Sequence, residues 1–229
     1  MAPELLYYPV RLMTARPTRP QSKPRAPRGR PPLSAEQRRR ILAATASVFL
    51  EKGYARANTS AIARRARASK QTLYALFPTK AGLFMGVMSA HTEKLFARHA
   101  YYIASEKPPR TALNEIGRSV LDLFTNAEYQ ALYRIVVGEA HQFPHLARQL
   151  WRQYSERGYA LLAGYLRSRG IGAPNYRRAA ERFVALVLGD YLLNVMLNPD
   201  QAWSRRVLLQ RVRRAVDDFC TIYPGADRR

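Results

Sequence analysis

The sequence contains a single cysteine, Cys220, so it forms no internal disulfide and no metal site built from several thiolates. It lacks an apolar run of roughly 18 residues, which a membrane-spanning helix needs. The best candidate, residues 183–197, is interrupted by Gly189, Asp190 and Asn194. A glycine-rich phosphate loop, His-Glu-x-x-His and Gly-x-Ser-x-Gly are also absent. We therefore predict no membrane contact, catalytic residue, cofactor or metal; the single cysteine fits a reducing cytoplasm.

Acidic residues are scarce, since the sequence has 16 Asp and Glu but 38 Lys and Arg, which gives a net charge of +22. Such a charge indicates a polyanionic partner, either nucleic acid or an anionic membrane. The excess is uneven: residues 1–80 carry 17 Lys and Arg against 3 acids, whereas residues 81–229 carry 21 against 13. The partner is therefore expected at the N-terminal third of the chain.

Residues 1–32 hold eight of the fifteen prolines, and from Arg11 to Arg30 there are seven basic residues and no acid. Such a segment buries too little apolar surface to offset its ordering entropy, so we expect a disordered basic arm. Its first dozen residues look unlike the rest, which makes Met13 an alternative start. Residues 27–31 (PRGRP) resemble an AT-hook core, with Arg28 and Arg30 in a narrow minor groove. The alternative is a solvated linker that adds only non-specific affinity.

Residues 58–80 (NTSAIARRARASKQTLYALFPTK) have the pattern of two short helices joined by a tight turn. Asn58 or Thr59 can cap the first helix and Ser69 the second, because their side-chain oxygens can accept from free first-turn amides. The second helix begins at Lys70 and stops near residue 77, before a proline. Its basic N-terminal end is suited to a DNA major groove, which admits one helix.

A set of residues at fixed spacing carries a family resemblance: Ile62-Ala63, Ser69-Lys70, Thr72-Leu73-Tyr74, Phe77-Pro78-Thr79-Lys80 and Leu83-Phe84. It resembles the DNA-binding domain of the TetR family of one-component transcriptional regulators over residues 33–84. Residues 133–144 are similar to the effector domains of one subgroup, the AefR-like regulators. The alternative to the N-terminal resemblance is an ordinary pair of amphipathic helices in a bundle.

Three positions depart from the family pattern. Arg67 stands where glycine is usual, and a left-handed backbone there would be strained for arginine. Leu76 stands where Tyr or His is common, and Ala81 where a glutamate commonly follows the lysine.

The resemblance implies that residues of the two short helices and Lys80 bind DNA, and we expect this of eight residues. Lys70, Gln71 and Thr72 are expected to meet base edges or adjacent phosphates, and Ser69 is expected to be a further DNA-binding residue. The DNA backbone is expected to meet Asn58, Thr59, Tyr74 and Lys80.

The rest of the chain has helical periodicity and no alternating strand pattern. Residues 34–37 form a capping box that opens the first helix, and Gly53 ends it as a left-handed cap. Later helices are expected over residues 80–106, 111–126, 128–142, 144–169, 176–198 and 201–223. We predict an all-α fold: a three-helix helix-turn-helix domain over residues 33–80, a ligand-binding and dimerisation domain over 81–223, and a tail at 224–229.

The middle of the chain is rich in aromatic side chains with polar tips, which can line a pocket for a mostly apolar ligand. The predicted pocket residues are Phe96, His99, Tyr102, Phe124, Tyr133, His141, Phe143, Trp151 and Tyr154. The alternative is that each of these side chains belongs to the core.

The last two helices carry more apolar surface than one buried face needs. In the resembled family such helices pair with their symmetry mates. The predicted dimer-interface residues are Phe183, Val187, Tyr191, Leu208, Val212, Val216 and Phe219. The alternative is a monomer with both helices packed centrally.

Together these features predict a homodimeric, ligand-responsive and sequence-specific regulator, more a repressor than an activator. In the mechanism that the resemblance implies, an unknown small apolar effector shifts the helix that begins near Thr79. The two recognition helices then no longer fit a palindromic operator on double-stranded DNA. The competing class is a basic architectural DNA-binding protein without sequence choice, which would not need the aromatic helices after residue 90.

Overall fold

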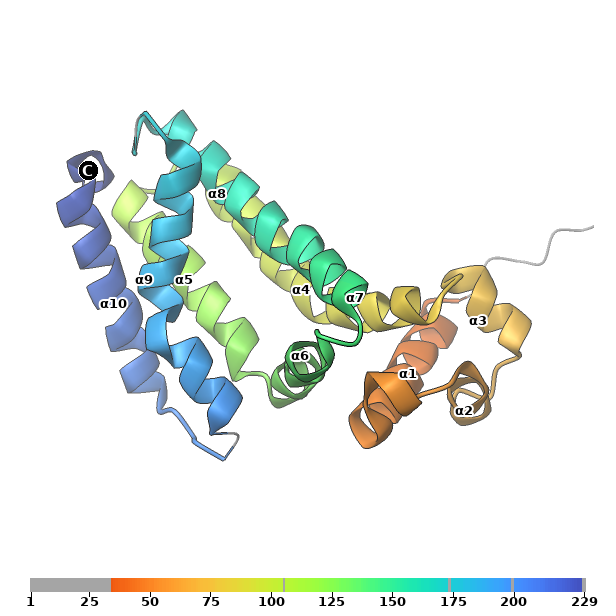
Figure 1. The fold of residues 1–229 in the computed structure, drawn as a ribbon. Coiled ribbons are helices and arrows are strands. Elements are labelled where there is room, and N and C mark those ends of the chain that lie inside the picture. The colour runs from red at the N-terminus through yellow and green to blue at the C-terminus, as the bar shows by residue number, and fades with distance from the viewer. Residues whose placement is uncertain (1–33, 105, 173, 199, 228–229) are drawn as a thin grey trace, which may run out of the picture. The chain divides into compact units, whose positions relative to one another are not determined.

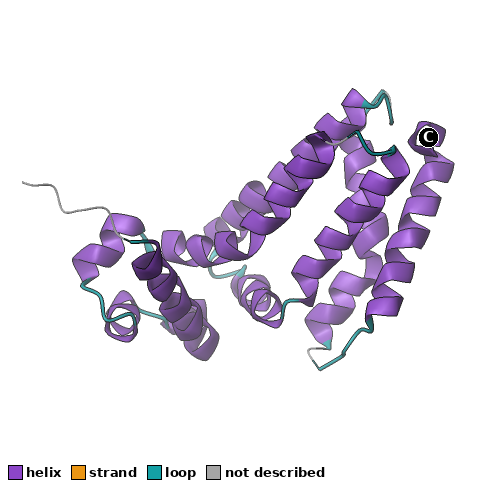
Figure 2. Ribbon diagram, turned by 180° about the vertical axis from the view of Figure 1, so that it is seen from behind, coloured by secondary structure: helices purple, strands orange, loops and turns teal. Residues whose placement is uncertain are grey.

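The computed structural model describes residues 34–104, 106–172, 174–198 and 200–227, and every regular element within them is helical. The arm predicted over residues 1–32 lies outside these residues. The first three helices are α1 (Ala35–Arg56), α2 (Thr59–Arg65) and α3 (Lys70–Leu76). The later elements are α4 (Lys80–Ala104), α5 (Pro109–Thr125), α6 (Ala127–Glu139), α7 (Pro144–Leu150), η1 (Trp151–Glu156), α8 (Arg157–Ser168), α9 (Tyr176–Leu197), α10 (Arg205–Ile222) and η2 (Pro224–Asp227). Figures 1 and 2 show their arrangement.

Helix α1 begins as its sequence dictates. The Ser34 hydroxyl accepts from the Gln37 amide at 3.1 Å, and the Gln37 side chain accepts from the Ser34 amide at 3.0 Å, which confirms the capping box. Gly53 takes a left-handed φ of 72° and interrupts the helix, but helical backbone resumes and the element ends at Arg56. The predicted end at Gly53 is therefore a break within α1.

Helices α2 and α3 form the predicted helix-turn-helix. The Asn58 side chain accepts from the Ala61 amide at 2.8 Å and caps α2, and the Ser69 hydroxyl accepts from the Thr72 amide at 3.0 Å and caps α3. Arg67, between them, has a φ of 48°, the left-handed value expected there. This conformation is costly for a residue with a side chain, so the turn is strained.

Helix α4 packs against α1 near its start and against α5 and α8 further along (Figure 1). The Thr79 hydroxyl accepts from the Gly82 amide at 2.9 Å and caps the helix, while Leu83, Phe84 and Met88 are fully buried. Helix α4 thus contributes to the core around α1 and to the core around the later helices.

The helices after residue 143 differ in detail from the predicted ones. The helix expected over residues 144–169 consists of α7, a π-helical turn η1 and α8, with helical backbone at the junctions. A π-turn widens the helix by one residue, and no sequence pattern marks it. Helix α9 is interrupted at Gly189, whose φ is 40°. Helix α10 begins at Arg205 rather than residue 201, because the Ser204 hydroxyl caps it. Residues 224–227 of the expected tail form η2, where Ala226 is buried.

No helix in the described ranges is long and apolar enough to cross a membrane.

Candidate functional site

The start of α3 presents polar side chains to solvent. Lys70 and Gln71 are exposed, and the side chain of neither makes a hydrogen bond or ion pair with another described residue. Thr72 is half-buried, and its hydroxyl lies 2.8 Å from that of Ser69. Ser69 is therefore engaged with its own helix, whereas the side chains of Lys70 and Gln71 are available to an outside partner.

Contacts within the helix-turn-helix hold α2 and α3 in register. The hydroxyls of Thr59 and Tyr74 lie 3.1 Å apart, and Tyr74 is 45% exposed. From α1, the guanidinium of Arg40 donates to the Ala66 carbonyl at 3.0 Å, and Arg65 of α2 pairs with Glu51 of α1. The residues of α2 and α3 that are expected to contact the DNA backbone therefore lie on helices that these hydrogen bonds and the ion pair hold together.

Lys80 occupies a different environment from the one expected of a phosphate contact. Its Nζ donates to the Ala55 carbonyl at 3.0 Å and lies 4.7 Å from the centre of the Tyr54 ring. Burial lowers the pKa of Lys80, and the nearby Glu139 carboxylate opposes that shift. Lys80 joins α4 to α1, so a phosphate would compete with these contacts. Arg28 and Arg30 lie outside the described residues.

A cavity of about 150 Å³ lies between α5, α6, the end of α7, η1, α8 and α9. Fourteen residues line it: Val120, Leu123, Phe124, Tyr129, Tyr133, Leu150, Trp151, Tyr154, Ser155, Gly158, Tyr159, Val184, Leu188 and Leu192. None of them carries a formal charge. The polar groups of this lining are the indole N–H of Trp151 and the hydroxyls of Ser155 and four tyrosines.

The tyrosine hydroxyls of the cavity are neutral at physiological pH. Burial raises the pKa of Tyr129 and of Tyr133, and raises that of Tyr154 to about 12. The Tyr154 hydroxyl donates to the Met85 carbonyl at 3.0 Å and lies 2.9 Å from the Ser89 hydroxyl, both in α4. A neutral aromatic lining with a few hydroxyls can hold an apolar ligand and orient one polar group on it.

The cavity contains four of the nine predicted pocket residues: Phe124, Tyr133, Trp151 and Tyr154. The other five predictions do not lie in its lining. Phe96 stacks on Tyr154 with the ring centres 6.5 Å apart, and buried His99 contacts the Ser119 hydroxyl at 2.8 Å. Tyr102 lies beside Lys107, His141 is exposed after α6, and Phe143 packs on Tyr54 at 4.9 Å. The ten lining residues that were missed come from six elements, and a sequence does not reveal which of their faces converge.

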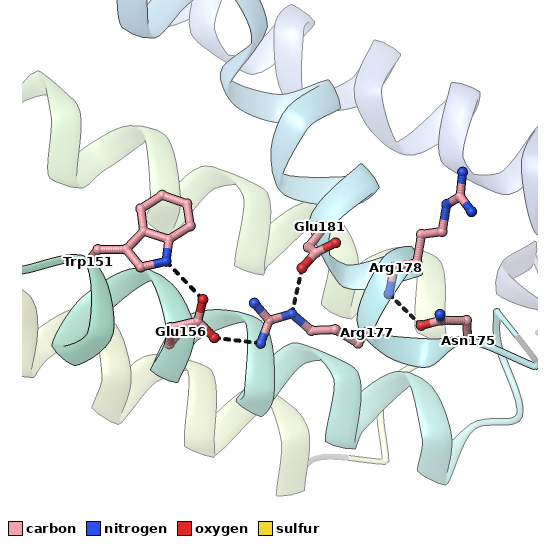
Figure 3. A network of polar contacts seen from close by, with 6 residues as sticks. All are labelled: Trp151, Glu156, Asn175, Arg177, Arg178 and Glu181. Carbon is pink, nitrogen blue, oxygen red and sulfur yellow. Dashed lines mark hydrogen bonds and ion pairs between the residues drawn. The ribbon is translucent and has the colours of Figure 1, made fainter. Parts of the chain in front are cut away.

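One edge of the cavity is held by a chain of polar contacts (Figure 3). The indole N–H of Trp151 donates to Glu156 at 2.8 Å, and Arg177 of α9 donates to the other oxygen of Glu156 at 2.8 Å and to Glu181 at 2.7 Å. The Arg177 guanidinium also lies 4.9 Å from the centre of the Tyr159 ring. Its hydrogen bond, followed by that of Trp151, lowers the pKa of Glu156. Trp151 and Tyr159 are thereby positioned at the cavity.

The predicted dimer-interface residues face the core of their own chain. Phe183, Val187, Tyr191, Val212, Val216 and Phe219 are all buried, and Leu208 packs on the same core. The rings of Phe183 and Phe219 lie 5.3 Å apart, and Val187 and Val212 pack over Gly117 of α5. Helical periodicity finds a buried face, but it does not tell whether the covering surface belongs to the same chain. The exposed apolar side chains of α9 and α10 are instead Leu193, Leu197, Val207 and Ile222.

Two family models match the chain. The model described as "Bacterial regulatory proteins, tetR family" matches residues 41–87, and the model described as "AefR-like transcriptional repressor, C-terminal domain" matches residues 111–225. No curated protein sequence matches the chain.

Solved structures share the fold over most of their length. A protein from Mesorhizobium loti described as a TetR-family transcriptional regulator is 25% identical, with a TM-score of 0.70 over 82% of this chain and 97% of that one. FrrA, named a flavonoid-responsive regulator, is 26% identical, with a TM-score of 0.65 over 83% and 98%. A transcriptional regulator from Rhodococcus sp. Rha1 is 22% identical, with a TM-score of 0.61 over 81% and 97%, and shares the fold alone.

Proposed function

Because the chain belongs to the TetR family of DNA-binding transcriptional regulators, we propose that it is a ligand-responsive repressor. A homodimer binds a palindromic operator and leaves it when a small, neutral, apolar effector occupies the central cavity. The proposed site of action is the cytoplasm, where bacterial DNA lies. The observation that carries the proposal is the uncharged, aromatic cavity in a chain whose α3 presents unpaired polar side chains.

For DNA binding, the proposal assigns base contacts to the exposed N-terminal end of α3. Lys70 and Gln71 are long, exposed donors, and a glutamine can bond an adenine edge through two hydrogen bonds. Asn58, Thr59 and Tyr74 contact phosphates, with Arg28 and Arg30 in the flanking minor groove. Lys80 serves first as a brace between α4 and α1, because it already bonds Ala55.

The uncharged lining of the cavity disfavours a charged effector, but it does not identify one compound. A buried carboxylate or ammonium without an opposite charge costs several kcal/mol or more, and the lining offers no counter-charge. The cavity is about the size that holds one benzene ring, since a dry cavity of roughly 150 Å³ binds benzene. We propose a neutral aromatic compound with one hydroxyl or carbonyl group. FrrA, whose name records a response to flavonoids, supports an aromatic effector but not its size, since a flavonoid has three rings.

For the dimer, we propose the exposed face of α9 and α10. Leu193 is 61% exposed, Leu197 68% and Val207 42%, near the turn that joins the two helices. A twofold interface would use this patch twice, and two recognition helices would then meet half-sites about one helical turn apart.

The proposal is tested by capturing genomic DNA fragments with the purified protein and then releasing them. Methyl benzoate and benzoate share a ring and differ in charge, so they form a matched pair of probes. We expect millimolar methyl benzoate to release the captured fragment and benzoate to leave it bound. Release by benzoate alone contradicts the neutral effector, and failure of a wider panel of neutral single-ring aromatics contradicts ligand response at this cavity.

A further inference from the structure

Helix α6 reaches from the cavity to the DNA-binding helices. Tyr129 and Tyr133 in its first half line the cavity, and Glu139, its last residue, contacts α1. At about 1.5 Å per residue, Tyr133 and Glu139 are separated by roughly 9 Å along the helix axis. One short helix thus has a cavity wall at one end and a contact with the DNA-binding domain at the other.

Glu139 bonds two backbone amides that α1 does not satisfy by itself. Its Oε1 accepts from the Tyr54 amide at 2.8 Å, and its Oε2 accepts from the Ala55 amide at 2.7 Å. These amides start a new helical turn, because the left-handed Gly53 breaks α1 directly before them. Hydrogen bonds to a carboxylate are roughly twice as strong as neutral ones. Glu139 therefore acts as a cap supplied from 84 residues away.

The surroundings of this cap fit a carboxylate closely. A Cβ on Gly53 would lie 2.6 Å from Oε1 of Glu139, so only glycine leaves room for it. Lys80 of α4, bonded to the Ala55 carbonyl, supplies a positive charge that interacts with Glu139. The Tyr54 ring packs edge-on against Phe84 of α4 at 5.7 Å and against Phe143 at 4.9 Å. Helices α1, α4 and α6 meet at this one point.

We propose that Glu139 is the positioning residue through which occupancy of the cavity sets the orientation of α1, α2 and α3. The inference rests on the proposed ligand response. A ligand that displaces Tyr129 and Tyr133 moves α6 and draws the carboxylate away from the Tyr54 and Ala55 amides, whose bonds weaken steeply with distance and angle. The conformer without these bonds holds the recognition helix in a different place, so DNA binding and cavity occupancy oppose each other.

The test fills the cavity by mutation, so it needs no knowledge of the effector. Gly158 lines the cavity, and a Cβ there meets only a Phe96 ring carbon at 4.0 Å, so the cavity wall has room for the side chain of Gly158→Leu. The dissociation constant for the captured operator is measured for four full-length proteins: wild type, Gly158→Leu, Glu139→Gln and the double variant. We expect Gly158→Leu to weaken binding on the order of tenfold in the wild-type background. With Glu139→Gln present, filling the cavity makes no further difference.

Glu128→Gln is the matched control. It makes the same change of charge on the same helix, but the Glu128 carboxylate lies 3.4 Å from His91 and not on α1. In this background Gly158→Leu retains its tenfold effect. An equal effect of Gly158→Leu with and without Glu139 overturns the role of Glu139 and leaves the proposed function standing. No effect in the wild-type background overturns both, because cavity occupancy then does not reach the DNA.

A second measurement needs no Glu139 variant and covers the case in which Glu139→Gln does not fold. Amide hydrogen exchange is compared between wild type and Gly158→Leu. The Tyr54 and Ala55 amides are expected to exchange faster in the variant, while the Ala61 amide, which Asn58 caps at 2.8 Å, keeps its rate. Unchanged exchange at Tyr54 and Ala55 overturns the inference.

Discussion

The guanidinium of Arg211 in α10 closes the break that Gly189 makes in α9. It donates to the carbonyls of Val187 and Leu188 at 2.8 and 2.9 Å, which the non-helical backbone at Gly189 leaves without helical partners. It also donates to Asp190 at 2.6 Å. Since the Arg211 side chain is 21% exposed and Asp190 83% exposed, the carbonyl bonds are the better shielded ones.

We predict that Arg211→Met lowers the free energy of unfolding by about 2 kcal/mol, since a lost hydrogen bond to a charged group costs 1.5–3 kcal/mol. Asp190→Asn removes only the exposed partner and is expected to have a much smaller effect. Denaturant unfolding of both variants measures the difference. Equal losses would mean that the ion pair, and not the carbonyl bonds, stabilises the break.

We predict that the free energy of unfolding decreases as the pH is lowered through a range set by His99. Burial lowers the pKa of His99 from 6.5 to about 4, so below pH 6.5 the unfolded chain takes up a proton that the folded chain refuses. The contribution of His99 to the free energy of unfolding is fully present above pH 6.5, and about 3 kcal/mol of it is lost as the pH falls to 4. His99→Leu should flatten this part of the profile. A profile identical to wild type would show that other groups cause the loss.

We predict that Trp151 reports ligand binding by fluorescence. The chain has two tryptophans, and Trp151 lines the cavity whereas Trp203 packs on Tyr191 at 5.3 Å. Methyl benzoate should change the emission of wild type and of Trp203→Phe, with the same dissociation constant. Trp151→Phe should lose the signal. A signal that survives in Trp151→Phe and disappears in Trp203→Phe would move the ligand away from this cavity.

We predict that Gln71 and Tyr74 affect DNA binding in different ways. Gln71→Ala should change the ranking of operator variants by about 1–3 kcal/mol at one base pair of each half-site, because it removes a base contact. Tyr74→Phe removes a hydroxyl that lies 3.1 Å from that of Thr59 and that we propose contacts phosphate, so it should weaken binding to every operator alike. Competition binding against a library of single-base variants separates the two patterns. Uniform losses for Gln71→Ala would contradict the assignment of a base contact.

The sequence predicted best what depends on near neighbours. The capping box at Ser34 and the cap at Ser69 each follow from a few adjacent residues, and the structure has both. The left-handed backbone at Arg67 was indicated by the family pattern, in which glycine is usual there, and the structure has it too. Ends set by a distant partner were less predictable. Gly53 indicated a helix end, but α1 continues beyond it because the carboxylate oxygens of Glu139 accept hydrogen bonds from the next two backbone amides.

The cavity and the dimer face show where sequence periodicity stops being informative. Phe96 and Phe143 are aromatic, as pocket residues often are, yet their rings pack against those of Tyr154 and Tyr54. The Phe183 face of α9 was assigned to a partner chain, but α5 and α10 cover it. Burial depends on which helix faces lie opposite one another, and that is decided by long-range packing.

The measurement that tests the central claim most directly is the affinity of the captured fragment relative to scrambled DNA of the same length at physiological salt. We predict a palindromic site that two chains bind roughly a thousandfold or more tightly than scrambled DNA. Equal affinities that fall together steeply with added salt would contradict this account. They would make the chain a basic architectural protein that holds the DNA backbone without reading sequence.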